Sequence, residues 1–423
     1  MLKSIHSFLR RCWIRIKSDW LYAWHNHTTR SMIRYFDWPL FLIVIGISLF
    51  GVVCIFSATS SEVTTAPSTI MEMLETQSIT YPRLQLIWLL AGIGAMCVFI
   101  FLPYLLFKRI SMAVYFLNIL ILLFTLAIAK AGRGAMKAFL SWGNDRGLQT
   151  SEFGKIAIII AFAASFSALH KPIERLKDSL SYILMLFAPL VLVILQPDFG
   201  TAMVYIAIFS VMVFVSGTNP KLIWSAILAV ALFALTYWVY MNTSASSSFR
   251  ATRILIWLDP EAYPDDARQV INAQIAVGSG GIWGKGIISP GSFASLGYIS
   301  DDHTDFIFAI VCESFGLVGG CSLVLAYVLL IGRMIHLALR TTERFGSFLI
   351  MGSAAMLIFH IVENLCMVIG LTPVTGIPLP FVSYGGSNML TNMIAIGLVE
   401  SVTIRTRYNA ANAMRTSLGT VNI

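Results

Sequence analysis

Charged residues are scarce in this sequence of 423 residues, at 12% of the chain. An ordinary soluble domain carries about 25%. The scarcity excludes a water-soluble enzyme, a disordered chain and a nucleic-acid-binding protein. Hydrophobic residues make up 57% of the chain, which predicts a polytopic helical membrane protein. Basic loops at a membrane surface explain the net charge of +8 without nucleic acid.

Cysteine pairs at metal-binding spacing and internal repeats are also missing from the sequence. The six cysteines include no CxxC pair, and most lie inside apolar runs. They are therefore interpreted as small packing residues, not as a metal or redox centre. Without repeats or a linker, the chain is predicted to form one membrane domain.

Residues 1–36 form a basic segment without a compact apolar core or a small-residue cleavage site, so it is not interpreted as a secretory signal. Apolar residues recur there at helical spacing, with lysines and arginines mostly between them. This pattern predicts a cytoplasmic amphipathic helix on an anionic membrane surface. A disordered basic tail is the alternative.

Ten apolar runs follow, each close to the roughly 20 residues that cross a bilayer. They are 38–58, 84–107, 110–129, 153–169, 179–196, 199–216, 222–241, 306–330, 348–369 and 387–404. Lysines and arginines occupy every second gap, in phase with the N-terminal segment. By the positive-inside rule both termini are cytoplasmic, which requires an even number of spans.

The predicted fold is therefore an all-α polytopic membrane protein with about ten transmembrane helices. Its membrane domain covers residues 37–407, and residues 408–423 form a cytoplasmic tail. Residues 242–304, between the seventh and eighth helices, form a long extracytoplasmic loop. That length is uncommon for a mere connection and indicates a functional role.

Ionisable residues outside the basic gaps gather at the extracytoplasmic ends of the predicted helices. Charges near hydrocarbon are costly, so they are candidates for function. The candidates are Lys137, Glu152, Lys155, Asp198, His303 and Asp305. Lysines bind diphosphates as point charges, and a carboxylate acts as a general base or holds a divalent cation. The pattern suits a substrate with phosphates and hydroxyls.

Each candidate also has a structural explanation. Glu152 and Lys155 are three residues apart on one helix face and can form a simple ion pair. Asp198 follows a proline and can shape a turn, Asp305 can favour a helix dipole, and His303 can be an ordinary loop histidine. Ionisable residues inside apolar runs are assigned to interhelical hydrogen bonds, with a proton path as the alternative. These are Glu313, His360, Glu363 and Glu400.

Two segments are rich in glycine or proline. The glycines of 278–286 allow the backbone to approach a ligand or to fold sharply. Residues 376–387 contain too much proline and glycine for a span. Non-helical backbone at membrane depth must be buried in protein or line a wet cavity. We therefore expect 376–387 to pack beside the external site.

Five segments, in this order, resemble the motifs of the SEDS family (shape, elongation, division and sporulation) of bacterial cell-wall polymerases. They are 149–152 with Lys155, 196–202, 278–286, 303–309 and 376–387. Within the family the chain is similar to the RodA branch more than to the FtsW branch, on Gln196, the paired glycine motifs and Pro378-Leu379-Pro380. Thr150 stands where relatives have proline, which leaves the start of the fourth span open.

The resemblance implies a peptidoglycan glycosyltransferase that polymerises lipid II, the undecaprenyl-diphosphate-linked disaccharide-peptide, at the outer face of the bacterial cytoplasmic (inner) membrane. Asp305 matches the family's essential catalytic aspartate. Glu152, Lys155 and Asp198 match further motif positions, and Lys137 stands where relatives usually have arginine. The implied partners are a class B penicillin-binding protein transpeptidase and membrane lipids.

In the expected mechanism, Asp305 takes the proton of the attacking sugar hydroxyl. Lys155 faces the leaving diphosphate, with Lys137 or a divalent cation, Mg²⁺ or Mn²⁺, held by Glu152 or Asp198. No organic cofactor is expected. The alternatives are a lipid II flippase or other transporter, a structural scaffold, and a division-type polymerase.

Overall fold

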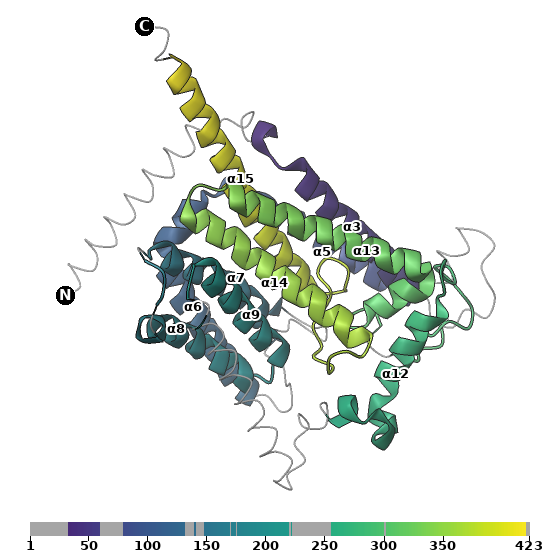
Figure 1. Cartoon of the computed structure of the whole chain (residues 1–423). Coiled ribbons are helices and arrows are strands. Elements are labelled where there is room, and N and C mark those ends of the chain that lie inside the picture. Colours follow the sequence, from purple (N-terminus) through teal and green to yellow (C-terminus); the bar gives the residue numbers. More distant parts are fainter. Residues whose placement is uncertain are drawn as a thin grey trace.

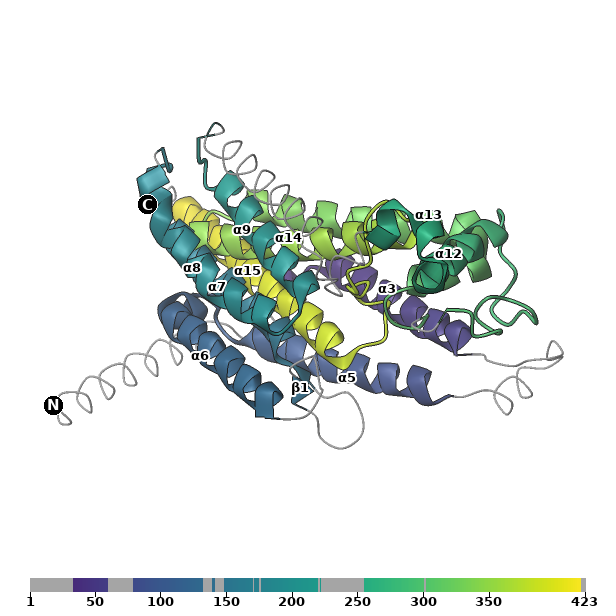
Figure 2. The same ribbon diagram turned by 90° about the horizontal axis from the view of Figure 1, so that it is seen from below.

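The protein is helical in a computed structural model, whose long helices run alongside one another (Figures 1 and 2). Two strands of two residues, β1 (Phe139–Leu140) and β2 (Leu148–Gln149), pair antiparallel. The structure describes residues 33–59, 79–131, 139–140, 148–169, 171–174, 176–219, 221, 255–299 and 302–419.

Nine of the ten predicted runs lie on long helices, and the tenth, 222–241, lies outside the described residues, as does most of the N-terminal segment. The helices are α3 (Trp38–Ala58), α5 (Thr80–Phe101), α6 (Tyr104–Ala131), α7 (Thr150–Ser167), α8 (Leu176–Leu195), α9 (Phe199–Val215), α13 (Ile307–Arg340), α14 (Arg344–Val368) and α15 (Gly386–Gly419). Among described residues, seven helices are long and apolar enough to cross a membrane: α3, α5, α6, α7, α8, α13 and α14. The prediction of an all-α, multi-pass membrane protein is confirmed.

Several predicted boundaries were wrong. The run 84–107 crosses the junction between α5 and α6, where Leu102 is extended. Pro103 follows it, lacks an N–H and disfavours helical geometry in the residue before it. Helices α13 and α15 continue past the apolar runs to Arg340 and Gly419, because a helix that leaves the hydrocarbon keeps its backbone hydrogen bonds.

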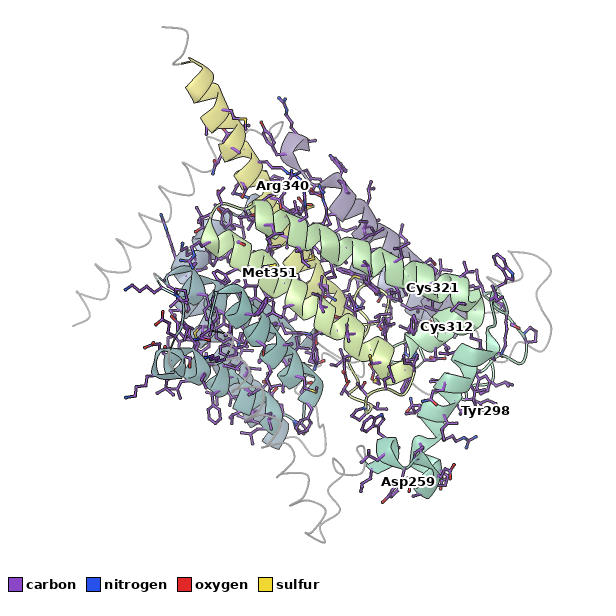
Figure 3. The ribbon with its side chains drawn as sticks, viewed as in Figure 1. Asp259, Tyr298, Cys312, Cys321, Arg340 and Met351 are labelled. Atoms are coloured by element: carbon purple, nitrogen blue, oxygen red, sulfur yellow. The ribbon has the colours of Figure 1, made fainter. Side chains whose placement is uncertain are left out.

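The basic connections gather at one end of the helices. Lys108 at the start of α6 pairs with Glu343 before α14, with Nζ 2.9 Å from Oε1. Arg405 of α15 donates to the carbonyl of Phe101 at the end of α5. Figure 3 shows Arg340 at this end of α13, whereas Cys312 lies at the opposite end, near α12 (Pro264–Ser279). The charge pattern thus separates two ends of the same bundle.

A buried carboxylate, Asp37, joins three helices at the basic end. Its Oδ1 accepts from the Leu40 N–H and so caps α3. Arg333 of α13 donates to both carboxylate oxygens, and Arg407 of α15 donates to Oδ2. Burial by itself raises the pKa of Asp37, but these hydrogen bonds outweigh it and hold the pKa below its ordinary value.

Replacing Asp37 by asparagine should lower the free energy of unfolding by about 1–3 kcal/mol, as expected when a charged hydrogen-bond partner is removed. Because the folded pKa is depressed, the carboxylate's contribution is complete above the unfolded pKa of about 3.9 and is lost as pH falls through the folded value. Unfolding of both proteins in detergent should therefore show a constant difference from about pH 7 to pH 5. A difference that shrinks within that range would contradict the assignment.

The long loop predicted between the seventh and eighth helices is not structureless in its described part, 255–299. It contains the 3-10 turn η1 (Pro260–Ala262) and helix α12, and it is tied to α13. Lys285 Nζ lies 2.7 Å from Glu313 Oε1, and Glu313 also accepts from the Phe293 and Ala294 N–H groups. Glu313 therefore anchors the loop, and its assignment to an interhelical hydrogen bond was wrong.

The loop glycines approach the backbone of α13. Gly284 has a φ of +80°, and a Cβ added there would lie 2.2 Å from the carbonyl oxygen of Ser314. Gly316 interrupts α13 with a φ of 68°. The N–H groups of Leu317 and Val318 bond to carbonyls of the loop instead. The sequence left open a ligand or a sharp fold here, and the structure shows backbone packed on backbone.

Gly284→Ala should therefore lower the free energy of unfolding by about 1–3 kcal/mol, because the methyl group meets main chain at a left-handed position. Gly278→Ala is the matched control. It lies in α12 with nothing within 4 Å of an added Cβ, so stability should stay unchanged or rise slightly. Thermal unfolding of both purified variants tests this, and equal stabilities would contradict it.

Candidate active site

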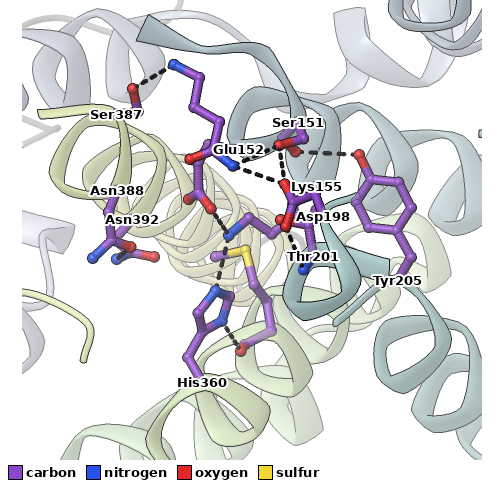
Figure 4. Close-up of polar contacts among 12 residues, drawn as sticks. Ser151, Glu152, Lys155, Asp198, Thr201, Tyr205, His360, Ser387, Asn388 and Asn392 are labelled. Atoms are coloured by element: carbon purple, nitrogen blue, oxygen red, sulfur yellow. Dashed lines mark hydrogen bonds and ion pairs between the residues drawn. The ribbon is translucent and has the colours of Figure 1, made fainter. Parts of the chain in front are cut away.

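Glu152 and Lys155, at the start of α7, form a buried ion pair (Figure 4). Lys155 Nζ lies 2.7 Å from Glu152 Oε1, and the two side chains are 1% and 7% exposed. Helix α7 begins at Thr150, so threonine starts it without the proline of relatives. The sequence allowed either a simple ion pair or a functional site here, and the structure shows that the ion pair forms. Because both side chains are buried, it is not a solvated surface pair.

His360 of α14 gives Lys155 a second partner. Lys155 Nζ lies 2.8 Å from His360 Nε2, and His360 Nδ1 lies 2.7 Å from the carbonyl oxygen of Met356. The sequence assigned His360 to an interhelical hydrogen bond, which the structure confirms. The sequence did not indicate that Lys155 would be its partner, because the two residues are 205 positions apart.

Asp198 joins the start of α9 to the start of α7. Its Oδ1 accepts from the Thr201 N–H, at 3.2 Å, and so caps α9. Its Oδ2 accepts from Ser151 Oγ and Gln149 Nε2, each at 2.7 Å. Asp198 therefore shapes the turn, as the structural explanation had it, and also fixes the residues beside Glu152.

Asp305 lies immediately before α13, in a turn held by the glycine- and proline-rich segment 376–387. Asn364 Nδ2 donates to the main-chain oxygens of Asp305 and Ile377, at 2.7 and 2.8 Å. A Cβ at Gly376 would lie 3.2 Å from Asp305 Oδ2, so the absence of a side chain there lets the carboxylate approach this backbone closely. Segment 376–387, predicted to pack beside the external site, thus contacts the turn that carries Asp305.

One face of α14 connects the two groups of candidates. His360 contacts Lys155, and Asn364 contacts the Asp305 main chain. These two α14 residues are four apart and lie on one face, separated by about 6 Å along the axis. Lys155 and Asp305 are thus held against adjacent turns of the same helix.

Segment 376–387 and its flanks close the arrangement from the other side. Ser387 Oγ accepts from the Gln149 N–H at 2.8 Å. A Cβ at Gly200, two residues after Asp198, would lie 2.8 Å from a side-chain carbon of Ile377. Segment 376–387 therefore contacts the start of α7, the start of α9 and the Asp305 turn, which carry Glu152 with Lys155, Asp198 and Asp305.

The remaining candidates are placed differently. His303 Nδ1 lies 3.0 Å from Asp302 Oδ1, and its ring packs against Tyr81 at 4.6 Å and Tyr384 at 5.8 Å. These contacts are those of a loop histidine near the start of α13, and none of them reaches the Lys155 cluster. Lys137 lies outside the described residues.

Unsatisfied polar atoms lie beside the ion pair. Asn388 and Asn392 of α15 appear next to Glu152 in Figure 4, and α15 packs against α7. Glu152 Oε2, Asn388 Nδ2 and Asn392 Oδ1 are buried without a hydrogen-bond partner among the described residues. Buried polar atoms are normally paired, so this region has hydrogen-bonding capacity for water or a polar substrate.

The carboxylates do not suit the divalent cation considered from the sequence. Glu152 Oε1 bonds to an ammonium, and both oxygens of Asp198 already accept hydrogen bonds. Among the residues that the structure describes, no three His, Cys, Asp or Glu side chains gather as a metal site. Mg²⁺ takes six oxygens and Ca²⁺ six to eight, which these hydrogen-bonded carboxylates do not supply by themselves.

The fold and site define a polytopic membrane protein with a buried cation–carboxylate site at the end of its bundle opposite the basic one. The family model described as "Cell cycle protein", of FtsW, RodA and SpoVE, matches residues 37–408. The chain belongs to this family, the SEDS family, and is a peptidoglycan glycosyltransferase.

Similar proteins carry the names of peptidoglycan glycosyltransferases. The probable peptidoglycan glycosyltransferase FtsW of Trichlorobacter lovleyi is 32% identical, over 87% of this chain and 93% of its own. The peptidoglycan glycosyltransferase MrdB of Escherichia coli is 35% identical, over 68% of this chain and 76% of its own. A solved peptidoglycan synthase complex, described as coordinating polymerization and crosslinking, contains a chain 28% identical with a TM-score of 0.67, covering 88% and 98% of the two chains.

Proposed function

We propose that this glycosyltransferase polymerises lipid II into glycan strands at the outer face of the bacterial cytoplasmic membrane. The observation that carries the proposal is the placement of Asp305 and Lys155 against adjacent turns of α14. A carboxylate and an ammonium so arranged suit a reaction in which a hydroxyl loses a proton while a diphosphate leaves.

Asp305 acts as the general base. A sugar hydroxyl is a poor nucleophile, and a carboxylate within hydrogen-bond reach accepts its proton as the oxygen attacks. The new bond joins that oxygen to the anomeric carbon of the growing chain. The bond from the anomeric carbon to the diphosphate breaks, and its electron pair leaves with undecaprenyl diphosphate. Gly376, which has no side chain, lets the Asp305 carboxylate lie against segment 376–387.

Lys155 stabilises the leaving diphosphate. Its ammonium has three N–H groups, of which Glu152 and His360 take two. A positive group fixed in a site of low dielectric stabilises developing negative charge without reorganising. The prenyl tail stays in the bilayer, which explains why this site lies in a helical membrane protein.

The biological role we propose is cell elongation and shape, as in the RodA branch. It rests on the sequence variants Gln196 and Pro378-Leu379-Pro380, whereas named relatives include FtsW as well as MrdB. The partner proposed is a class B penicillin-binding protein transpeptidase, supported by the similarity to the chain in the polymerisation and crosslinking complex.

A lipid II flippase or another transporter is the rival function. A transporter needs access from both faces of the membrane, whereas here the candidate residues lie at one end and Arg333, Arg407 and Asp37 tie the other end together. The glycosyltransferase proposal is therefore the better supported.

Purified protein, with and without a co-expressed partner transpeptidase, should convert lipid II to glycan strands resolved on a gel. Liposomes carrying fluorescent lipid II distinguish the rival function. Headgroup translocation without strand formation would support a flippase and contradict the proposal.

A further inference from the structure

We infer that His360 is a positioning residue, which orients the Lys155 ammonium for the leaving diphosphate through an uncharged hydrogen bond. The inference rests on the proposed function, because it assigns a role within the same site. It starts from the hydrogen-bonding capacity of the two ring nitrogens of His360.

The partner of Nδ1 decides where the proton of the ring lies. Met356 offers a carbonyl oxygen, which only accepts, 2.7 Å from Nδ1. Nδ1 therefore carries the hydrogen and donates it. The Met356 carbonyl is the i−4 oxygen of the same helix, so the ring is held against its own backbone and its rotation is restricted.

The remaining nitrogen, Nε2, must then accept. Lys155 as an ammonium has three donors and no acceptor, and its Nζ lies 2.8 Å from Nε2. An imidazolium would set an N–H against an N–H and a positive charge against another. His360 is therefore the neutral imidazole, and its lone pair points at Lys155.

Glu152 and His360 have different effects on Lys155. Glu152 supplies the opposite charge that a buried ammonium requires. His360 orients the ammonium through a hydrogen bond and adds no further negative charge. The third N–H of the ammonium is left for another acceptor. The same face of α14 carries Asn364, which holds the Asp305 main chain. Helix α14 thereby contacts both the Lys155 ammonium and the main chain of Asp305.

Two substitutions separate the hydrogen bonds of His360. In His360→Gln the amide oxygen reaches about as far as Nε2 and can accept from Lys155. In His360→Asn the shorter amide can keep the Met356 bond but falls short of Lys155. If orientation matters, His360→Asn should lower kcat about 10- to 100-fold with little change in KM for lipid II, because misplacement by about 1 Å has effects of this size. His360→Gln should retain kcat within about threefold.

A double-mutant cycle tests whether His360 acts through Lys155. In a Lys155→Met background the Gln and Asn variants should have equal residual activity, since the interaction they distinguish is gone. Ser353→Ala is the control on the same helix, because Ser353 is buried and its hydroxyl donates to the Leu349 carbonyl of its own helix. Its kcat should match wild type.

Each purified protein is assayed with lipid II. Thermal unfolding of a separate sample gives the folded fraction, and rates are expressed per folded molecule. Equal kcat for His360→Gln and His360→Asn, or a Gln–Asn difference that persists without Lys155, would overturn the inference. If the wild-type protein with its partner makes no strands, the proposed function fails instead, so the two failures are distinguishable.

Discussion

Asp305→Asn should abolish glycan-strand synthesis while the protein stays folded in the membrane. Asparagine has nearly the shape of aspartate but does not accept a proton from a sugar hydroxyl. Loss of a general base lowers rates by about 10²–10⁴-fold. Folding should persist, because asparagine keeps nearly the same side-chain shape and the bond from Asn364 to the main-chain oxygen of Asp305 is retained.

The assay is the gel of strands from lipid II, at matched protein and partner concentrations. Asp259→Asn is the charge-matched control. Asp259 lies in the long loop that precedes the Asp305 turn and caps η1 by accepting from the Ala262 N–H, a role that asparagine fulfils equally well. The control should polymerise at the wild-type rate. Full polymerisation by Asp305→Asn would remove the catalytic assignment.

Lys155→Met should lower kcat by about 10²–10³-fold, the usual cost of removing one preorganised group that stabilises developing charge. Methionine retains the length of the buried stem but not the ammonium. The same substitution leaves Glu152 buried without its ionic partner, which costs about 3–5 kcal/mol of stability. Stability and activity must therefore be separated.

The double variant Glu152→Gln with Lys155→Met separates them. It buries two neutral side chains, so thermal unfolding in detergent should return most of the way to wild type. Strand synthesis should stay at the low level of Lys155→Met. If activity recovers together with stability, Lys155 is needed only for folding and its role toward the diphosphate is wrong.

The helices and their two ends follow from local signals in the sequence. An apolar run of about 20 residues satisfies its backbone hydrogen bonds in a bilayer by forming a helix. Nine of the predicted spans therefore lie on helices. Lysines and arginines in alternate gaps separated the basic end from the end carrying Asp198 and Asp305. The helix boundary at Pro103 was missed because the apolar run continues through it. The helix ends there because proline has no backbone N–H, a property that hydropathy does not reveal.

Glycine signals were ambiguous for a physical reason. A missing Cβ permits close approach but does not say of what. At Gly284 the approaching group is the α13 backbone, whereas at Gly376 it is the carboxylate of Asp305. Only the packed chain distinguishes the two.

The sequence by itself determined the elements, the polar ends and the chemical groups available for catalysis, because each depends on residue type and near neighbours along the chain. Tertiary structure decided which groups meet. The sequence assigned His360 to an interhelical hydrogen bond and gave no signal for Asn364, yet on one face of α14 these residues contact Lys155 and the Asp305 main chain. Such contacts depend on how helix faces pack across hundreds of residues, which no local pattern encodes.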